Sequence, residues 1–154
     1  MKRALVCGPA VWLAVAVVAI VAAAALPGCA SAPVDPDCPQ AASELPVDAL
    51  YGRWEARFDG LPDVAGVQLA KHPEYAGSVR GTIVRSGTTA QLSGDIDDAG
   101  LLTLDESADG RSISAVWSGE LRAGSCGKEF KGTWRNSNDD STRTFVLHKT
   151  GGLP

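Results

Sequence analysis

Residues 112–121 read SISAVWSGEL, and apolar side chains occupy every second position of this stretch. Ile113, Ala115, Trp117, Gly119 and Leu121 share one face, and the opposite face is mostly polar. Successive side chains of a strand point to opposite faces, so this alternation predicts a strand with one buried face. The same period continues from Ala49 onward, and no stretch there has helical apolar spacing over three turns. We therefore expect an all-β domain.

Turn-forming residues separate the alternating stretches. Each break contains glycine, proline, aspartate or asparagine, and the breaks lie at 59–62, 72–73, 86–87, 97–100, 108–110, 123–124 and 136–140. They leave strands at about 49–58, 64–71, 77–85, 88–96, 101–106, 111–121, 127–135 and 142–149. Because the connections are short, neighbours should pair antiparallel in chain order. We predict a small eight-stranded up-and-down barrel over 49–150, since closure removes the exposed sheet edges.

A weak repeat of the form apolar, any residue, glycine, any residue, apolar supports the barrel. It occurs at 50–54, 79–83, 92–96, 117–121 and 130–134. Glycine inside a strand weakens a sheet unless the strand coils sharply or must receive a bulky neighbour. We predict that these glycines face inward and leave room for Trp54, Trp117 and Trp134.

Several short motifs resemble the avidin and streptavidin family of lipocalin-like barrels. Residues 52–54 (GRW) look like its opening strand, 79–82 (VRGT) and 92–95 (LSGD) like its third and fourth strands, and 116–120 (VWSGE) with 132–134 (GTW) like its sixth and seventh. The resemblance covers about 49–149. It implies that an arginine of the last strand packs on the opening tryptophan, a favourable cation–π contact. Arg143 shares a face with Phe145 and Leu147, so we expect Arg143 to cover Trp54.

The biotin site of that family does not carry over. The same alignment places Ala56, Ile83 and Leu147 where the family has polar side chains for the ureido group of biotin. The other polar positions fall near Arg85, Ile113 and Ala115, and of the aromatic walls only Trp117 and Trp134 remain. A buried polar ligand without hydrogen-bond partners binds poorly, so we expect an avidin-like barrel without biotin binding.

The first 28 residues have the composition of a secretory signal peptide. Lys2 and Arg3 precede an apolar run at 10–25, AVWLAVAVVAIVAAAA. Residues 26–29, LPGC, resemble the lipobox of bacterial lipoproteins, which implies cleavage before Cys29 and lipidation of that cysteine, palmitate included. Ala30 follows rather than aspartate, which favours the outer membrane over the inner, with the domain facing the periplasm or the cell surface. The alternative is an uncleaved transmembrane helix, which needs about 20 apolar residues.

Residues 29–48 are predicted to be a lipidated N-terminus and a solvated tether. The stretch 30–47 holds four prolines and no periodicity. Cys7 leaves with the leader and Cys29 carries lipid, so Cys38 and Cys126 remain as partners in an oxidising compartment. We predict a Cys38–Cys126 disulfide, with two separate thiols as the alternative.

No pattern of reactive residues indicates an enzyme, a metal or a cofactor. His72 and His148 are not clustered and read as surface residues. Asp95, Asp97, Gly100 and Glu106 match four positions of an EF-hand calcium loop, but Ala99 removes a ligand and strands flank the segment. The charges are mixed without a basic run, which excludes nucleic-acid binding.

With these functions set aside, the sequence leaves a binding function of one of two kinds. One hypothesis is a membrane-anchored module whose barrel holds a small, apolar ligand near Trp117 and Trp134. The other is a filled barrel that acts as a protein-interaction or protease-inhibitor-like domain on an envelope partner. A cavity above roughly 300 Å³ would favour the first hypothesis, and a filled barrel with an exposed apolar patch the second.

Overall fold

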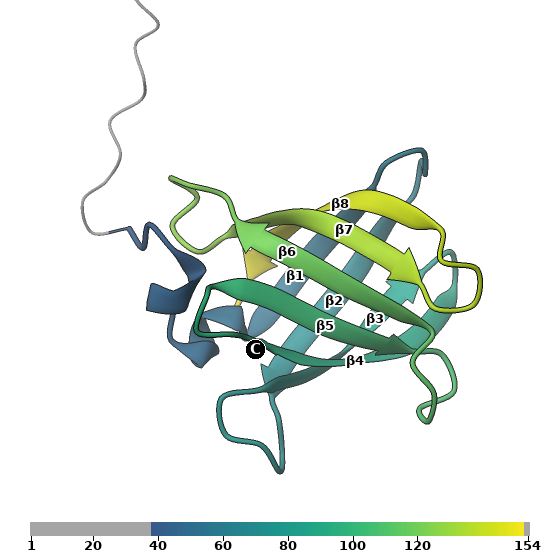
Figure 1. The fold of residues 1–154 in the computed structure, drawn as a ribbon, viewed down its shortest axis with the longest axis horizontal. Helices are drawn as coiled ribbons and strands as arrows, with labels where there is room; N and C mark the ends of the chain where they lie inside the picture. Colours follow the sequence, from purple (N-terminus) through teal and green to yellow (C-terminus); the bar gives the residue numbers. More distant parts are fainter. Residues whose placement is uncertain (1–37, 153–154) are drawn as a thin grey trace, which may run out of the picture. The chain divides into compact units, whose positions relative to one another are not determined.

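Eight antiparallel strands close into one barrel in a computed structural model that describes residues 38–152 (Figure 1). The predicted signal peptide and the predicted lipidation site, Cys29, lie outside the described residues. The strands are β1 (Gly52–Phe58), β2 (Val64–Lys71), β3 (Val79–Arg85), β4 (Thr88–Ile96), β5 (Leu101–Ser107), β6 (Ala115–Leu121), β7 (Glu129–Asn136) and β8 (Thr142–Gly151). Each strand pairs with its neighbour in the chain, and β1 pairs with β8. The predicted all-β meander barrel is confirmed.

The barrel interior is packed with the apolar side chains of the alternating pattern. Its largest fully buried members are Trp54, Trp117, Phe130 and Phe145. The rings of Trp117 and Phe145 lie 4.9 Å apart between centroids, and those of Trp54 and Phe130 lie 5.9 Å apart. Tilted and edge-to-face pairs at these separations are favourable beyond the area they bury.

The mid-strand glycines are explained mainly by strand coiling. A Cβ on Gly81, Gly94 or Gly132 would collide with the backbone carbonyl of the neighbouring strand. Only Gly119 leaves room for an aromatic ring, since its Cβ would lie 2.9 Å from the ring of Phe145. The prediction that the glycines make space for three tryptophans is therefore wrong. Glycine is needed at these positions because adjacent backbones approach each other closely in a tightly coiled sheet.

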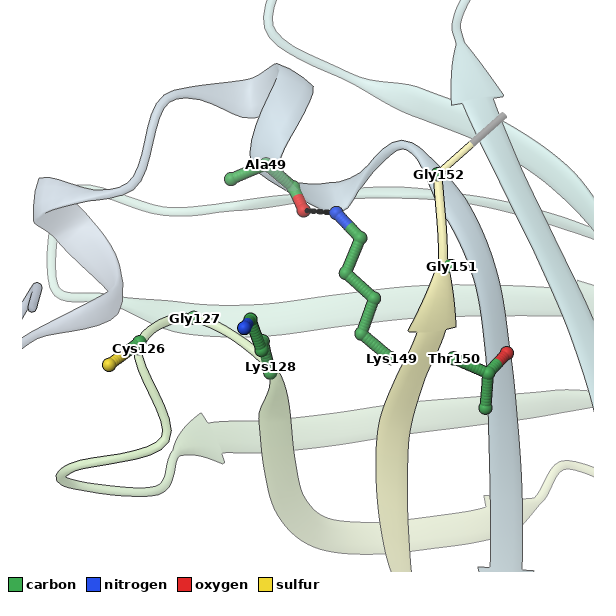
Figure 2. Close-up of a pocket in the computed structure, with 8 residues that line it drawn as sticks. All are labelled: Ala49, Cys126, Gly127, Lys128, Lys149, Thr150, Gly151 and Gly152. Carbon is green, nitrogen blue, oxygen red and sulfur yellow. Dashed lines mark hydrogen bonds between the residues drawn. The ribbon is translucent and has the colours of Figure 1, made fainter. Parts of the chain in front are cut away.

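One end of the barrel, called the capped end here, is closed by residues 38–50. Two short 3₁₀ helices, η1 (Ala42–Glu44) and η2 (Val47–Leu50), lie there beside β5 and β2 respectively. Leu50 is 0 % exposed, and its carbonyl accepts a hydrogen bond from the indole N–H of Trp54 at 2.9 Å. Lys149 of β8 donates to the carbonyl of Ala49 (Figure 2).

The expectation of a solvated tether up to residue 47 does not hold from Ala42 onward. Ala42 belongs to the hydrophobic core, and Leu45 and Val47 pack against it. Ala42 and Leu45 are three residues apart, as are Val47 and Leu50, which matches the i→i+3 geometry of each 3₁₀ turn. Such a segment is too short to give the three-turn periodicity used to recognise helices.

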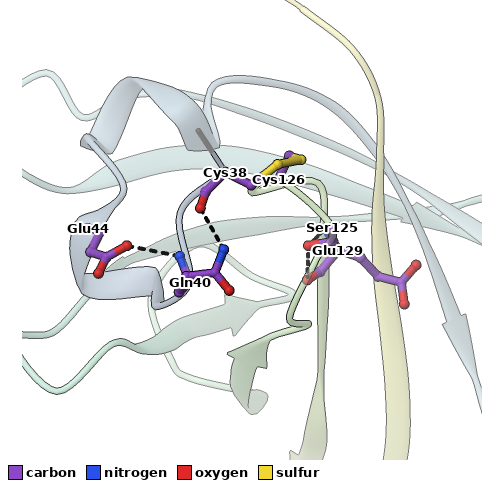
Figure 3. The surroundings of a disulfide bond; sticks show 6 residues. All are labelled: Cys38, Gln40, Glu44, Ser125, Cys126 and Glu129. Atoms are coloured by element: carbon purple, nitrogen blue, oxygen red, sulfur yellow. Dashed lines mark hydrogen bonds between the residues drawn. A yellow bond between two sulfur atoms is a disulfide. The ribbon is translucent and has the colours of Figure 1, made fainter. Parts of the chain in front are cut away.

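A disulfide joins Cys38 to Cys126, as predicted, across a sequence separation of 88 (Figure 3). It fastens the start of the described chain to the connection between β6 and β7. Beside it, the side-chain amide of Gln40 donates to the carbonyl of Cys38 at 2.8 Å. The disulfide thus holds the cap on the barrel.

The other end, called the open end here, carries the connections β1–β2, β3–β4, β5–β6 and β7–β8. Within residues 38–152, no helix is long and apolar enough to cross a membrane.

Candidate functional site

A cavity of about 240 Å³ opens at the open end of the barrel. Strands β3, β4, β5 and β7 and the adjoining connections supply its walls. The lining residues are Ile83, Arg85, Thr88, Ala90, Glu106, Ala108, Ser114, Trp134, Asn136 and Asn138. Apolar and polar groups converge there, which is the usual make-up of a small-molecule site, although the volume is below the usual range of roughly 300–1,000 Å³.

Glu106 forms the floor of this cavity and is only 4 % exposed. Its Oε2 accepts hydrogen bonds from the indole N–H groups of Trp117 at 3.0 Å and Trp134 at 3.1 Å. Its Oε1 accepts a bond from the guanidinium of Arg85 at 2.8 Å. A carboxylate can be buried when it is paired and hydrogen-bonded in this way. The three donors come from β3, β6 and β7, so Glu106 links side chains across the barrel.

Arg85 is held between this carboxylate and two aromatic rings. The centre of its guanidinium lies 5.1 Å from the ring centroid of Phe58 and 5.3 Å from that of Trp134. Cation–π contacts of this kind contribute about 0.5–2 kcal/mol each. The Arg85–Glu106 pair leaves the floor of the cavity without net charge.

The rim is built from ordered turns. The hydroxyl of Ser114 donates to the carbonyl of Glu106 at 3.0 Å, and the backbone N–H of Asn138 donates to the side-chain oxygen of Asn136 at 2.8 Å. In the β5–β6 connection, hydrogen bonds from Ser112, and then from the backbone N–H of Arg111, hold the pKa of Asp109 well below its ordinary value. These contacts give the mouth a defined shape before any ligand arrives.

The predicted tryptophans meet at this site, but in different roles. Trp117 is fully buried in the core, whereas Trp134 is half-buried and lines the cavity. They are cross-strand partners, and both donate to Glu106. Trp134 is therefore the tryptophan that a ligand could touch.

The prediction that Arg143 covers Trp54 is wrong. Arg143 is exposed at the open end, where its guanidinium donates to the carbonyl of Asp59 at 3.4 Å. Lys149 takes the expected place, with its Nζ 5.4 Å from the ring centroid of Trp54. The reason is the antiparallel pairing of β1 and β8, which sets Trp54 opposite Lys149 near the end of the last strand.

Sequence reasoning did not identify Glu106 and Arg85 as a pair. The alternation of inward and outward side chains does indicate that both residues face inward. Glu106 continues the inward series of Leu102 and Leu104 along β5. Arg85 follows Ile83 on the inward face of β3. A charged residue at the end of an inward-facing series marks the mouth of a barrel. Their proximity across the barrel required the closed sheet.

The other candidates do not form a site together. Asp97 caps its own turn by accepting the backbone N–H of Leu101 at 2.8 Å, while Glu106 faces the opposite end of the barrel, so the calcium-loop spacing has no structural counterpart. Among the described residues, no group of three or more His, Cys, Asp or Glu could hold a metal ion.

The two histidines differ from each other. His72 is buried rather than on the surface, and its Nδ1 accepts the backbone N–H groups of Glu74 and Tyr75 at 3.1 Å. His148 is exposed and lies 3.7 Å from the carboxylate of Glu129. His72 thus organises the β2–β3 connection, a role that its position before Pro73 did not reveal.

The three positions aligned with the ureido group of biotin carry apolar side chains, and of these only Ile83 lines the cavity at the open end. Ala56, Ile83 and Leu147 are all buried in the core. No protein-family model matches this chain, and a search of curated proteins found no match either.

Proposed function

We propose that this protein is a membrane-anchored envelope lipoprotein whose barrel binds a small, uncharged ligand at the open end. The observation that carries the proposal is the buried carboxylate of Glu106, which fixes Arg85 and Trp134 around a cavity of about 240 Å³. Groups held in place before binding lower the entropic cost of taking up a ligand.

The chemistry of the cavity limits the ligand. Ile83, Ala90 and Trp134 offer apolar surface, while Thr88 and Asn136 offer polar groups at the rim. The charges of Arg85 and Glu106 balance each other, which favours an uncharged ligand. A charged ligand would find no counter-ion in the part of the cavity beside Glu106. Buried apolar side chains such as Trp117 and Leu104 fill the interior, and the cavity at the open end is about 240 Å³, so the ligand is small and mostly apolar.

We further propose binding rather than catalysis. Both oxygens of Glu106 accept hydrogen bonds from indole and guanidinium groups, so its observed contacts support a structural role for this carboxylate.

The anchor is proposed from the leader and the lipobox-like residues 26–29. Lipid on Cys29 would hold the domain at the outer membrane, facing the periplasm or the cell surface. The avidin-like relationship is likewise a proposal, supported by the closed eight-stranded meander and the motifs of β1, β3, β4, β6 and β7.

The test is native mass spectrometry of the full chain, expressed with its leader in a bacterium with two membranes and extracted in mild detergent. We expect diacylglycerol on Cys29 and an additional co-purifying molecule. The variant Trp134→Phe, which removes a donor at the mouth, should lose that molecule. Trp54→Phe, the matched change at the capped end, should retain it. A wild-type protein without extra mass, or equal loss in both variants, would refute a ligand site at the mouth.

A second candidate function is favoured by the cavity volume of about 240 Å³, which is below the roughly 300 Å³ expected of a ligand carrier, and by the filled interior. It rests on exposed apolar side chains around the same mouth. Leu61 and Ile113, in the β1–β2 and β5–β6 connections, are 37 % and 49 % exposed. They would contact an envelope protein that inserts a side chain into the cavity. Ile113→Ser would then abolish capture of that protein while leaving any co-purifying small molecule in place.

A further inference from the structure

A second cavity, of about 370 Å³, lies at the capped end (Figure 2). The turn after β6, the end of β8 and η2 contribute to its walls. The lining residues are Ala49, Cys126, Gly127, Lys128, Lys149, Thr150, Gly151 and Gly152. No step of the proposed ligand binding at the mouth uses this cavity.

Two lysines face this cavity from adjacent chain segments. The backbone N–H of Lys149 donates to the carbonyl of Lys128 at 2.8 Å, so the two residues are cross-strand neighbours. The Nζ of Lys149 donates one hydrogen bond to the carbonyl of Ala49 at 2.6 Å and lies over the ring of Trp54. This positions the ammonium group and leaves donors for a further partner.

The two ammonium groups lie on neighbouring segments and are not held by ion pairs to any described residue. Within residues 38–152, neither Lys128 nor Lys149 forms a salt bridge with a carboxylate. Burial is the largest influence on Lys149 and lowers its pKa; the charge of Asp48 raises this pKa, and the charge of Lys128 lowers it by a smaller amount. Like charges on neighbouring strands destabilise a sheet, and an anion between them would relieve the repulsion.

We propose that this cavity binds a phosphate group between Lys128 and Lys149. A phosphate offers several oxygens, so it can accept hydrogen bonds from both ammonium groups at once. A Cβ on Gly152 would meet nothing within 4 Å, so the backbone there is open to the ligand.

The cavity also lies where the chain leaves for its anchor, and this step rests on the proposed function. Cys126 lines the cavity and is bonded to Cys38, nine residues after Cys29. Nine residues span at most about 32 Å when fully extended. Lipid on Cys29 would therefore keep the cavity near the bilayer surface, where lipid head groups supply phosphate.

The test uses the full chain in neutral detergent and follows the amide NMR signals of Gly127 and Gly152. Inorganic phosphate is titrated in one arm and a soluble short-chain phosphatidic acid in the other. We expect saturable shifts. Lys128→Gln should weaken binding about fivefold, the effect of one lysine near an anionic surface. Lys131→Gln, the same charge change at an exposed position of β7 outside the cavity, should leave the affinity unchanged.

Each outcome has a defined meaning. Saturation with both ligands supports a site for the phosphate group itself, and saturation with the phosphatidic acid alone supports a site for a lipid head group. No saturable shift with either ligand, or equal weakening by Lys128→Gln and Lys131→Gln, overturns the proposal. A protein without lipid on Cys29 would refute the anchor but would leave the inorganic phosphate result intact, so the two failures are distinguishable.

Discussion

At the scale of single residues, Glu106 has the most consequential environment. Its carboxylate is buried and satisfied by donors from three different strands. Removing one member of such a network leaves the others without partners inside the protein, and that cost usually exceeds the net value of the bonds themselves.

Glu106→Ala should lower the free energy of unfolding by about 3 kcal/mol, because it orphans two indole N–H groups and the charge of Arg85. Glu106→Gln, which keeps an acceptor, should cost less. Urea unfolding followed by far-UV circular dichroism measures both, independently of tryptophan emission. Equal stability of the alanine variant and the wild type would show that the network does not stabilise the barrel.

Asp109 gives a prediction on pH. Hydrogen bonds from Ser112 and Arg111 hold its pKa below the ordinary value of 3.8 in the folded protein. A carboxylate with a lowered folded-state pKa stabilises the fold above its unfolded pKa, and this contribution is lost as the pH falls below that value. Asp109→Asn should therefore be less stable than the wild type at pH 7, and the difference should shrink as the pH falls below about 3.8. Urea unfolding at neutral and acidic pH tests this, and a difference that does not change with pH would contradict it.

At the scale of secondary-structure elements, the strands could be predicted from the sequence, whereas the segment 38–50 that closes the capped end could not. Alternation and turn residues placed all eight strands within a few residues of their observed bounds, because a barrel strand buries one face along its whole length. The 3₁₀ turns at 42–50 carry no comparable signal. The face that Arg143 shares with Phe145 and Leu147 does not determine its partner, because the antiparallel pairing of β1 and β8 sets Lys149, and not Arg143, opposite Trp54.

The mid-strand glycines provide a matched pair of substitutions. Gly132→Ala would place a Cβ against the backbone of β6, which must move, and we expect a loss of about 1–3 kcal/mol. A Cβ on Gly66 of β2 meets nothing within 4 Å, so Gly66→Ala should be neutral or slightly stabilising. Thermal unfolding of the two variants measures the difference. Equal melting temperatures would show that the strands tolerate closer approach than the structure indicates.

At the scale of the whole molecule, the two ends of the barrel differ. One end is closed by residues 38–50 and the disulfide, and the other presents four connections around the Glu106 cavity. The sequence indicated the disulfide partners through the cysteine count. It could not indicate the Glu106–Arg85 site, which depends on how β3 and β5 meet in the closed barrel, or the Lys128–Lys149 cavity, which depends on where η2 lies at the capped end.

Replacing both Cys38 and Cys126 with serine should lower the free energy of unfolding by about 4–5 kcal/mol, the chain-entropy value for a loop of this length. Urea unfolding with and without a reducing agent provides the control. The wild type should fall to the stability of the double variant under reduction, and the variant should not change. A wild type that is unaffected by complete reduction would contradict a stabilising role.

The disulfide also decides where a mechanical load enters the domain. A pull on the chain ahead of Cys38 passes through the sulfur atoms directly to Cys126 and the β6–β7 connection. Residues 39–51 then lie outside the path of the force, so the cap stays seated while the hydrogen-bonded ladders of β6 and β7 bear the tension. With the anchor proposed above, tension on the chain ahead of Cys38 would strain this connection before it disturbed the cap or reached the mouth at the far end.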